Sequence, residues 1–187
     1  LIPYLEMKKI KVTETNIGDF VCNLLNQVPY NIKFSAANQT TSQVADLYTN
    51  NFGIKENCNA RQLTICTKQL LKDDISNPDA VITGANFLFF ISGTIVLTEN
   101  EGNILKATAN APIHIVVAGI DKLIASIDEL SVLLPLSSYY EPQKNISSFY
   151  NFINKPLEEN GNVQKLYLVL LNNNRTNILA KEKQREI

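Results

Sequence analysis

The sequence predicts an α/β fold in which a helical N-terminal part precedes a mostly parallel, Rossmann-like sheet. Apolar residues recur at helical spacing up to about residue 77. From Asp79 onward, short β-branched runs replace that spacing, which is typical of strands buried in a parallel sheet. A further segment with helical spacing lies between the third of these runs and the last one. The 187 residues suit a single domain, with a helical part at about 1–77 and a sheet-rich part at about 78–187.

The N-terminal part predicts three helices. The first covers 15–27, with Thr15 as a possible cap and Pro29 closing the segment. The second begins at a cap of Thr40 or Thr41 and ends at Gly53. The third covers about 58–73 and breaks near Asn77-Pro78, and a short run at 32–34 indicates a strand.

The C-terminal part predicts four buried strands and one helix. The strands correspond to the apolar runs 80–82, 94–97, 113–118 and 166–171. The helix covers 121–134 and is stopped by Pro135. Residues 137–163 are polar and rich in Asn and Pro, which indicates a long loop with little regular structure.

Composition excludes several classes of protein. A net charge of −1, with both signs interspersed, gives no basic surface for nucleic acid. No segment approaches the roughly 20 apolar residues of a membrane span, and the first residues do not resemble a secretory signal. Cys22, Cys58 and Cys66 lack C-x-x-C spacing, which argues against a disulfide framework, a metal site or an iron–sulfur cluster within this chain. We therefore expect a cytoplasmic protein with free thiols.

The polar corners between the apolar runs are the first candidate site. Thr83, Gly84 and Asn86 form one corner, and Ser92, Gly93 and Thr94 form the next. Their N–H and hydroxyl groups could bind an anionic ligand, since α/β sheets bind ligands at the carboxyl ends of their strands. The alternative is structural, because Gly84 and Gly93 would permit a positive φ or a close approach of two chain segments.

Four more candidate positions follow in the sequence. The turn Asn100-Glu101-Gly102-Asn103 offers ligand contacts, with Glu101 as the acid/base candidate, although such a sequence also suits a tight loop. His114, the only histidine, is a catalytic candidate or a hydrogen-bonded core residue. Lys122 is a ligand-binding candidate or a solvated charge at a helix start. Walker, G-x-G-x-x-G, H-E-x-x-H and G-x-S-x-G motifs do not occur, so the sequence supports no nucleotide kinase, dinucleotide dehydrogenase, zinc protease or α/β-hydrolase.

Several blocks in one order resemble a known family. They read TGANFLFFISGTIVLTENEGN at 83–103 and PIHIVVAGIDK at 112–122. Further matching blocks are QVADL at 43–47, Ala60-Arg61, and KLYLVLLNNNRTNIL with the following KEKQREI at 165–187. Together they resemble the lactate-utilisation (LUD) domain family over most of the chain from about Ile17.

The resemblance implies both a fold and a role. It implies kinship with the architecture of sugar-phosphate isomerases and CoA-transferases, which bind small anions at strand ends. It also implies a subunit of a complex that oxidises L-lactate to pyruvate, with other lactate-utilisation subunits as partners. The 4Fe-4S clusters of such a complex are then expected outside this chain, on a C-terminal ferredoxin-like module after Ile187 or on a partner subunit.

Three departures from the family pattern leave other functions open. Ile91 stands where the family usually has an acidic residue, and Asn31 and Asn38 stand where it often has histidine. Isoleucine can neither accept a proton nor form a hydrogen bond, so chemistry that needs a carboxylate at 91 is absent. The alternatives are a non-catalytic domain that docks cluster-bearing partners, or an isomerase or transferase of a phosphorylated or CoA-linked acid with Glu101 as base.

Overall fold

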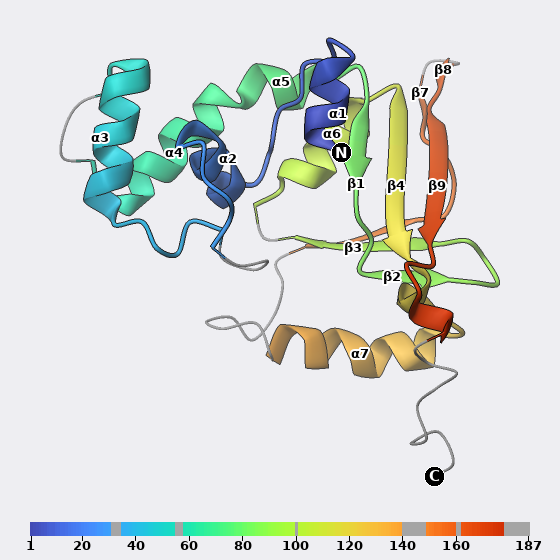
Figure 1. Cartoon of the computed structure of the whole chain (residues 1–187). Helices are drawn as coiled ribbons and strands as arrows, with labels where there is room; N and C mark the ends of the chain where they lie inside the picture. The colour runs from blue at the N-terminus through green and yellow to red at the C-terminus, as the bar shows by residue number, and fades with distance from the viewer. Residues whose placement is uncertain (31–34, 55–57, 100, 140–148, 160–161, 178–187) are drawn as a thin grey trace. The chain divides into compact units, whose positions relative to one another are not determined.

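A computed structural model describes residues 1–30, 35–54, 58–99, 101–139, 149–159 and 162–177 of the chain. The chain forms two compact units, Leu1–Ser76 and Asn77–Ile187. The first is helical and the second contains the sheets (Figure 1). The expected strand at 32–34 lies outside the described residues. None of the described helices is long and apolar enough to cross a bilayer.

All the regular secondary structure in the described part of the first unit is helical. The helices are α1 (Ile2–Met7), α2 (Ile17–Leu24), α3 (Thr41–Phe52), α4 (Ala60–Leu70) and α5 (Lys72–Ser76). The cap expected at Thr40 is confirmed: its side chain and that of Gln43 cap each other's backbone N–H groups, and Gly53 ends α3 with φ +65°. The cap expected at Thr15 is wrong, because the Asn16 side chain accepts the Asp19 N–H instead. The third expected helix is interrupted at Leu71 and continues as α5.

Tyr48 lies at the centre of the first unit's core. Its side chain is fully buried, and its hydroxyl lies 2.6 Å from the Thr67 hydroxyl. The ring makes T-shaped contacts with Phe20 and Phe52. The family block QVADL lies on α3, where Gln43 forms the capping box with Thr40 and Ala45 packs in the core, so packing can account for this block.

The second unit contains two sheets of three and four strands and one short hairpin. The three-stranded sheet has the order β1–β4–β9, from β1 (Val81–Thr83), β4 (Ile113–Gly119) and β9 (Lys165–Leu171). The four-stranded sheet has the order β5–β2–β3–β6, from β5 (Leu123–Ile124), β2 (Phe87–Phe89), β3 (Ile95–Glu99) and β6 (Phe149–Ile153). β7 (Glu158–Glu159) and β8 (Asn162–Val163) form the hairpin.

The three-stranded sheet confirms the α/β prediction. All its strands run parallel, and β4 pairs with β9 along seven residues, from Ile113 opposite Lys165 to Gly119 opposite Leu171 (Figure 1). In the other sheet β2 and β5 are parallel, whereas β3 is antiparallel to both neighbours. β4 is buried on one face and half-buried on the other, so its continuous apolar run did not indicate two fully covered faces.

Three segments of the second unit differ from the sequence prediction. Helix α6 (Asn103–Asn110) occupies a segment for which only a turn was expected. The helix expected at 121–134 is replaced by the 3-10 turn η1 (Ile120–Lys122), strand β5 and helix α7 (Ile127–Tyr139), and Pro135 lies inside α7. The loop expected at 137–163 contains β6, which pairs with β3 along five residues.

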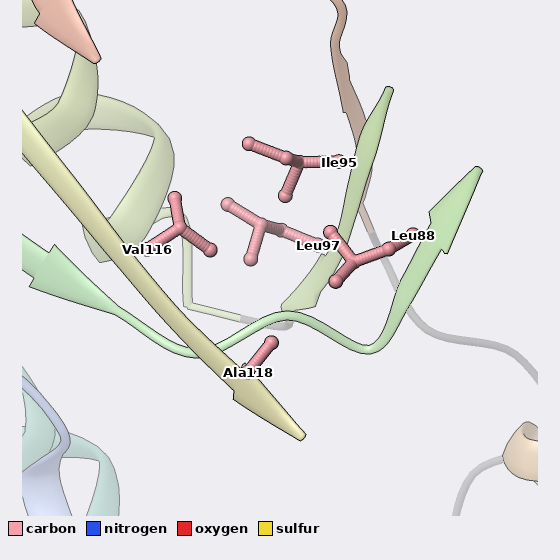
Figure 2. Close-up of a cluster of buried hydrophobic side chains, with 5 residues drawn as sticks. All are labelled: Leu88, Ile95, Leu97, Val116 and Ala118. Carbon is pink, nitrogen blue, oxygen red and sulfur yellow. The ribbon is translucent and has the colours of Figure 1, made fainter. Parts of the chain in front are cut away.

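The core of the second unit lies between its two sheets. Val116 and Ala118 of β4 point toward Leu88, Ile95 and Leu97 of β2 and β3 (Figure 2). All five side chains are almost completely buried. His114 stands on the same buried face of β4, at its start, because alternate residues of a strand face the same side.

Candidate functional site

His114 is a fully buried imidazole in an otherwise apolar strand. Its Nε2 lies 2.8 Å from the Thr83 hydroxyl oxygen. Its Nδ1 is also buried and has no hydrogen-bond partner among the described residues. Burial lowers the pKa of His114 below its usual range, because the charged imidazolium loses hydration in the core. His114 therefore favours the neutral form, in which one ring nitrogen donates and the other accepts.

A cavity of about 790 Å³ lies over this histidine. Helix α6, strand β6 and the segment that follows β6 form its walls. Its lining residues are Leu105, Thr108, Ala109, His114, Tyr150, Asn151, Phe152, Ile153, Asn154, Lys155, Pro156, Leu157, Glu158 and Gln164. The size is that of a typical small-molecule site, and the lining combines apolar side chains with a few polar ones, as such sites usually do.

The lowered pKa of His114 makes stability depend on pH. The unfolded chain binds a proton on this imidazole near pH 6.5, whereas the folded chain resists it. We expect the contribution of His114 to the free energy of unfolding to be constant above that pH, and to decrease as the pH falls through about 6.5 toward the lower folded-state pKa. Urea denaturation between about pH 5 and pH 8 would measure this. His114→Gln should lose the slope, because it removes the only histidine, and an equal slope in both proteins would contradict the assignment.

Glu99 is a buried carboxylate that the sequence prediction missed. It accepts hydrogen bonds of 2.8 Å from the backbone N–H groups of both Ile104 and Leu105, and one of 3.0 Å from the Asn151 side chain. The carboxylate thus occupies the positive N-terminal end of α6, where N–H groups lack partners within the helix. Glu99 joins β3, β6 and α6 beside the cavity that Asn151 lines.

The turn at Glu101 stands between Glu99 and α6. Gly102 precedes α6 with φ +75°, and the Asn103 side chain donates a hydrogen bond of 2.7 Å to Glu101. Asn103 is almost fully buried, whereas Glu101 is half-buried. Asn100 lies outside the described residues. The roles predicted for Glu101, Gly102 and Asn103 stay predictions, and neither glutamate lines the cavity.

The corner from Ser92 to Thr94 is the turn between β2 and β3. The two hydroxyl oxygens lie 2.8 Å apart, and Gly93 has φ +70°. The conformational requirement expected at Gly93 is therefore confirmed. At Gly84 it is wrong, because its φ is not positive and an added Cβ would lie an ordinary 3.9 Å from the nearest atom, the Val117 oxygen.

The remaining candidates lie apart from the cavity lining. The Asn86 side chain accepts the Thr98 N–H at 2.9 Å, which holds the start of β2 against β3. Lys122 lies in η1, just beyond the carboxyl end of β4, with its Nζ 3.9 Å from the Asp121 carboxylate. The structure thus brings Thr83 together with His114. The hydrogen bonds and ion pairs of the described residues do not connect the predicted corners and the turn at Glu101 into one site.

The cysteines do not form a cluster site. Cys22 is buried and directs its thiol at the Ser35 carbonyl, while Cys58 and Cys66 are half-buried against the core of the first unit. Among the described residues, no group of three or more His, Cys, Asp or Glu side chains is placed to hold a metal ion. The cysteines described here therefore do not fit the ligand set of a 4Fe-4S cluster.

Comparison with known proteins identifies the family. The family model of the LUD domain matches residues 5–169. Lactate utilization protein B of Geobacillus sp. (strain WCH70) is 28% identical over 96% of this chain and 38% of its own length. The uncharacterized electron transport protein YkgF of Escherichia coli (strain K12) is 24% identical over 92% of this chain and 37% of its own length. This chain thus spans less than two-fifths of these two relatives.

A solved structure of a DUF162 family protein from Deinococcus radiodurans shares 14% identity and a TM-score of 0.40, covering 70% of this chain and 84% of that one. The family model spans both units, from α1 to β9. It includes every candidate site residue discussed above. The chain belongs to the LUD domain family.

Proposed function

We propose that this chain is the LUD module of a lactate-utilisation protein and serves the oxidation of L-lactate to pyruvate. The observation that carries the proposal is the alignment of relatives named lactate utilization protein B with nearly the whole chain. Oxidation of L-lactate to pyruvate releases two electrons and two protons. We propose that the electrons pass to 4Fe-4S clusters outside this chain, on another module or on other subunits of a cytoplasmic complex.

The geometry supports this proposal with a candidate base. His114 favours the neutral state because burial lowers its pKa, and a neutral imidazole can accept a proton. It stands under a cavity large enough for a small organic acid. We assign the module to binding the acid and handling its protons.

Deleting the gene that encodes this chain should prevent growth on L-lactate as the only carbon source. Growth on pyruvate should be normal, because pyruvate enters metabolism after the proposed step. Growth rate on each carbon source measures both effects, and reintroducing the wild-type gene should restore growth on L-lactate. A deletion strain that grows on L-lactate at the wild-type rate would overturn the proposed function.

One observation favours the docking domain as a second candidate function. Phe90 and Ile91, at the turn between β2 and β3, are 61% and 78% exposed, although both are large and apolar. Exposed apolar side chains of this kind are common at protein interfaces. In the same growth assay, a gene with Ile91→Glu should fail to restore growth if this turn docks a partner, and should restore it if the turn has no such role.

A further inference from the structure

Two basic side chains and one acidic side chain meet beyond the carboxyl ends of β4 and β9. Arg175 Nε lies 2.5 Å from the Asp121 carboxylate, and Lys122 Nζ lies 3.9 Å from the other oxygen of the same carboxylate. The two strands end level, since Gly119 is opposite Leu171. The segments that follow them therefore meet at one edge of the parallel sheet, the edge where α/β proteins bind ligands.

The backbone after β9 fixes the position of Arg175. Asn173 and Asn174 both have positive φ, 43° and 64°, which asparagine tolerates better than most residues. The Arg175 N–H donates to the Asn172 carbonyl at 2.9 Å, and the Asn172 side chain accepts the Thr176 N–H at 3.1 Å. The arginine thus stands on an ordered, hydrogen-bonded turn.

Gly119 makes room for Asp121. A Cβ on Gly119 would lie 2.1 Å from the Asp121 carboxylate oxygen and 3.5 Å from Arg175 Nε. The Gly119 backbone is in the ordinary extended region, with φ −71° and ψ 147°, so the conformation itself does not require glycine. A side chain at this position would therefore displace the Asp121 carboxylate from its place against the backbone.

The contact between Arg175 and Asp121 orients the guanidinium and leaves its outer edge available. Asp121 pairs with the Nε, and no hydrogen bond among the described residues engages the two terminal nitrogens. The Arg175 side chain is 39% exposed and that of Lys122 is 47% exposed. Ion pairs at this exposure contribute little to stability. The stability of the fold therefore does not explain why these three charged side chains are grouped here.

We propose that Arg175, oriented by Asp121 and assisted by Lys122, binds the carboxylate of a small organic acid. A guanidinium recognises a planar carboxylate through two parallel N–H bonds, which a lysine cannot reproduce. Two cations beside one carboxylate leave a positive charge for the ligand. L-lactate and pyruvate are chosen as probes because of the proposed function. The site itself rests on the geometry at this sheet edge and is separate from the cavity at His114, which lies at the opposite end of β4.

Titration of the 187-residue chain with pyruvate, L-lactate or inorganic phosphate would test this site. The chain contains only three arginines, so their Nε–H signals are resolvable by NMR, and the Arg175 signal is identified by its loss in Arg175→Lys. We expect the chemical shift of the Arg175 Nε–H to change saturably as pyruvate or L-lactate is added. Arg175→Lys should weaken binding at least about tenfold, the effect of losing one charge-assisted hydrogen bond.

Two glycine variants separate orientation from charge. Gly119→Ala should displace Asp121 and weaken binding several-fold while every charged group is retained. Gly18→Ala, the same substitution in helix α2 of the helical unit, should bind like the wild type. Arg61→Lys, in the helical unit, controls for a general effect of replacing arginine.

The outcomes distinguish this site from the proposed function. Binding that is unchanged in both Arg175→Lys and Gly119→Ala would overturn the site, as would an Arg175 signal that moves with none of the three anions. A response to phosphate alone would overturn the carboxylate assignment. If the acids bind at Arg175 but the deletion strain grows normally on L-lactate, the site stands and the proposed function falls. If the acids do not bind at Arg175 but the deletion strain fails to grow on L-lactate, the site falls and the proposed function stands.

Discussion

Glu99→Gln is expected to lower the free energy of unfolding of the sheet-containing unit by about 2–3 kcal/mol. The substitution keeps the size of the side chain but replaces one carboxylate oxygen with an NH₂ group. That group then faces a buried donor, either a backbone N–H of α6 or the Asn151 amide. The substitution also removes the negative charge at the start of α6. Hydrogen exchange of the Ile104 and Leu105 amides should accelerate by a factor of about 30 or more, which corresponds to 2 kcal/mol.

Glu158→Gln is the matched control for this prediction. Glu158 lines the cavity and is exposed, so its neutralisation should change the free energy of unfolding by less than about 0.5 kcal/mol. Equal effects of the two substitutions would show that the carboxylate at 99 does not hold α6. A large effect on α6 amides in Glu99→Gln alone would support the contacts described here.

The same carboxylate explains why α6 could not be predicted from the sequence. The helix fully buries Asn103, Ala107 and Thr108, which are small or polar, and its two large apolar residues, Ile104 and Leu105, are adjacent and show no helical spacing. Its start has no side-chain cap in the adjacent residues, because the capping carboxylate is Glu99, at the end of the preceding strand. The α3 helix was predictable because Thr40 and Gln43 form a local capping box.

Strand pairings and ion pairs between distant segments set the second limit. β6 lies in a polar, Asn-rich stretch, and its pairing with β3 depends on residues about fifty positions earlier in the chain. Pro135 does not end α7. Leu130, Leu133 and Leu134 pack against the sheet and hold the helix at that point. The contact between Arg175 and Asp121 likewise joins segments that follow two paired strands, β4 and β9. The sequence indicated that the sheet is parallel, but not the register of these two strands.

The sequence predicted some of the residues of the candidate site, but not how these residues are arranged. His114 was identified because a lone histidine in an apolar strand is conspicuous, and the structure places it under a cavity. The glycine with a close contact is Gly119, beside the Asp121 carboxylate, whereas an added Cβ on Gly84 would make only an ordinary contact. Nothing local in the sequence distinguishes these two glycines, since the requirement comes from the conformation of Asp121.

The largest loss of stability is expected for Tyr48→Ala, at about 3–5 kcal/mol in the helical unit. The substitution removes a fully buried ring that makes T-shaped contacts with both Phe20 and Phe52. It also leaves the buried Thr67 hydroxyl without its side-chain partner. Urea denaturation, followed by hydrogen exchange of α3 and α4 amides, would measure the loss in this unit.

Tyr48→Phe separates packing from hydrogen bonding in the same site. It keeps the ring and removes the hydroxyl, so we expect a loss of about 1 kcal/mol, the usual net contribution of one hydrogen bond. Tyr4→Ala controls for loss of a tyrosine, because Tyr4 is 57% exposed on α1 and should change stability by less than about 0.5 kcal/mol. If Tyr48→Ala costs no more than Tyr48→Phe, the ring does not hold the core. The match of the QVADL block on α3 would then need an explanation other than packing.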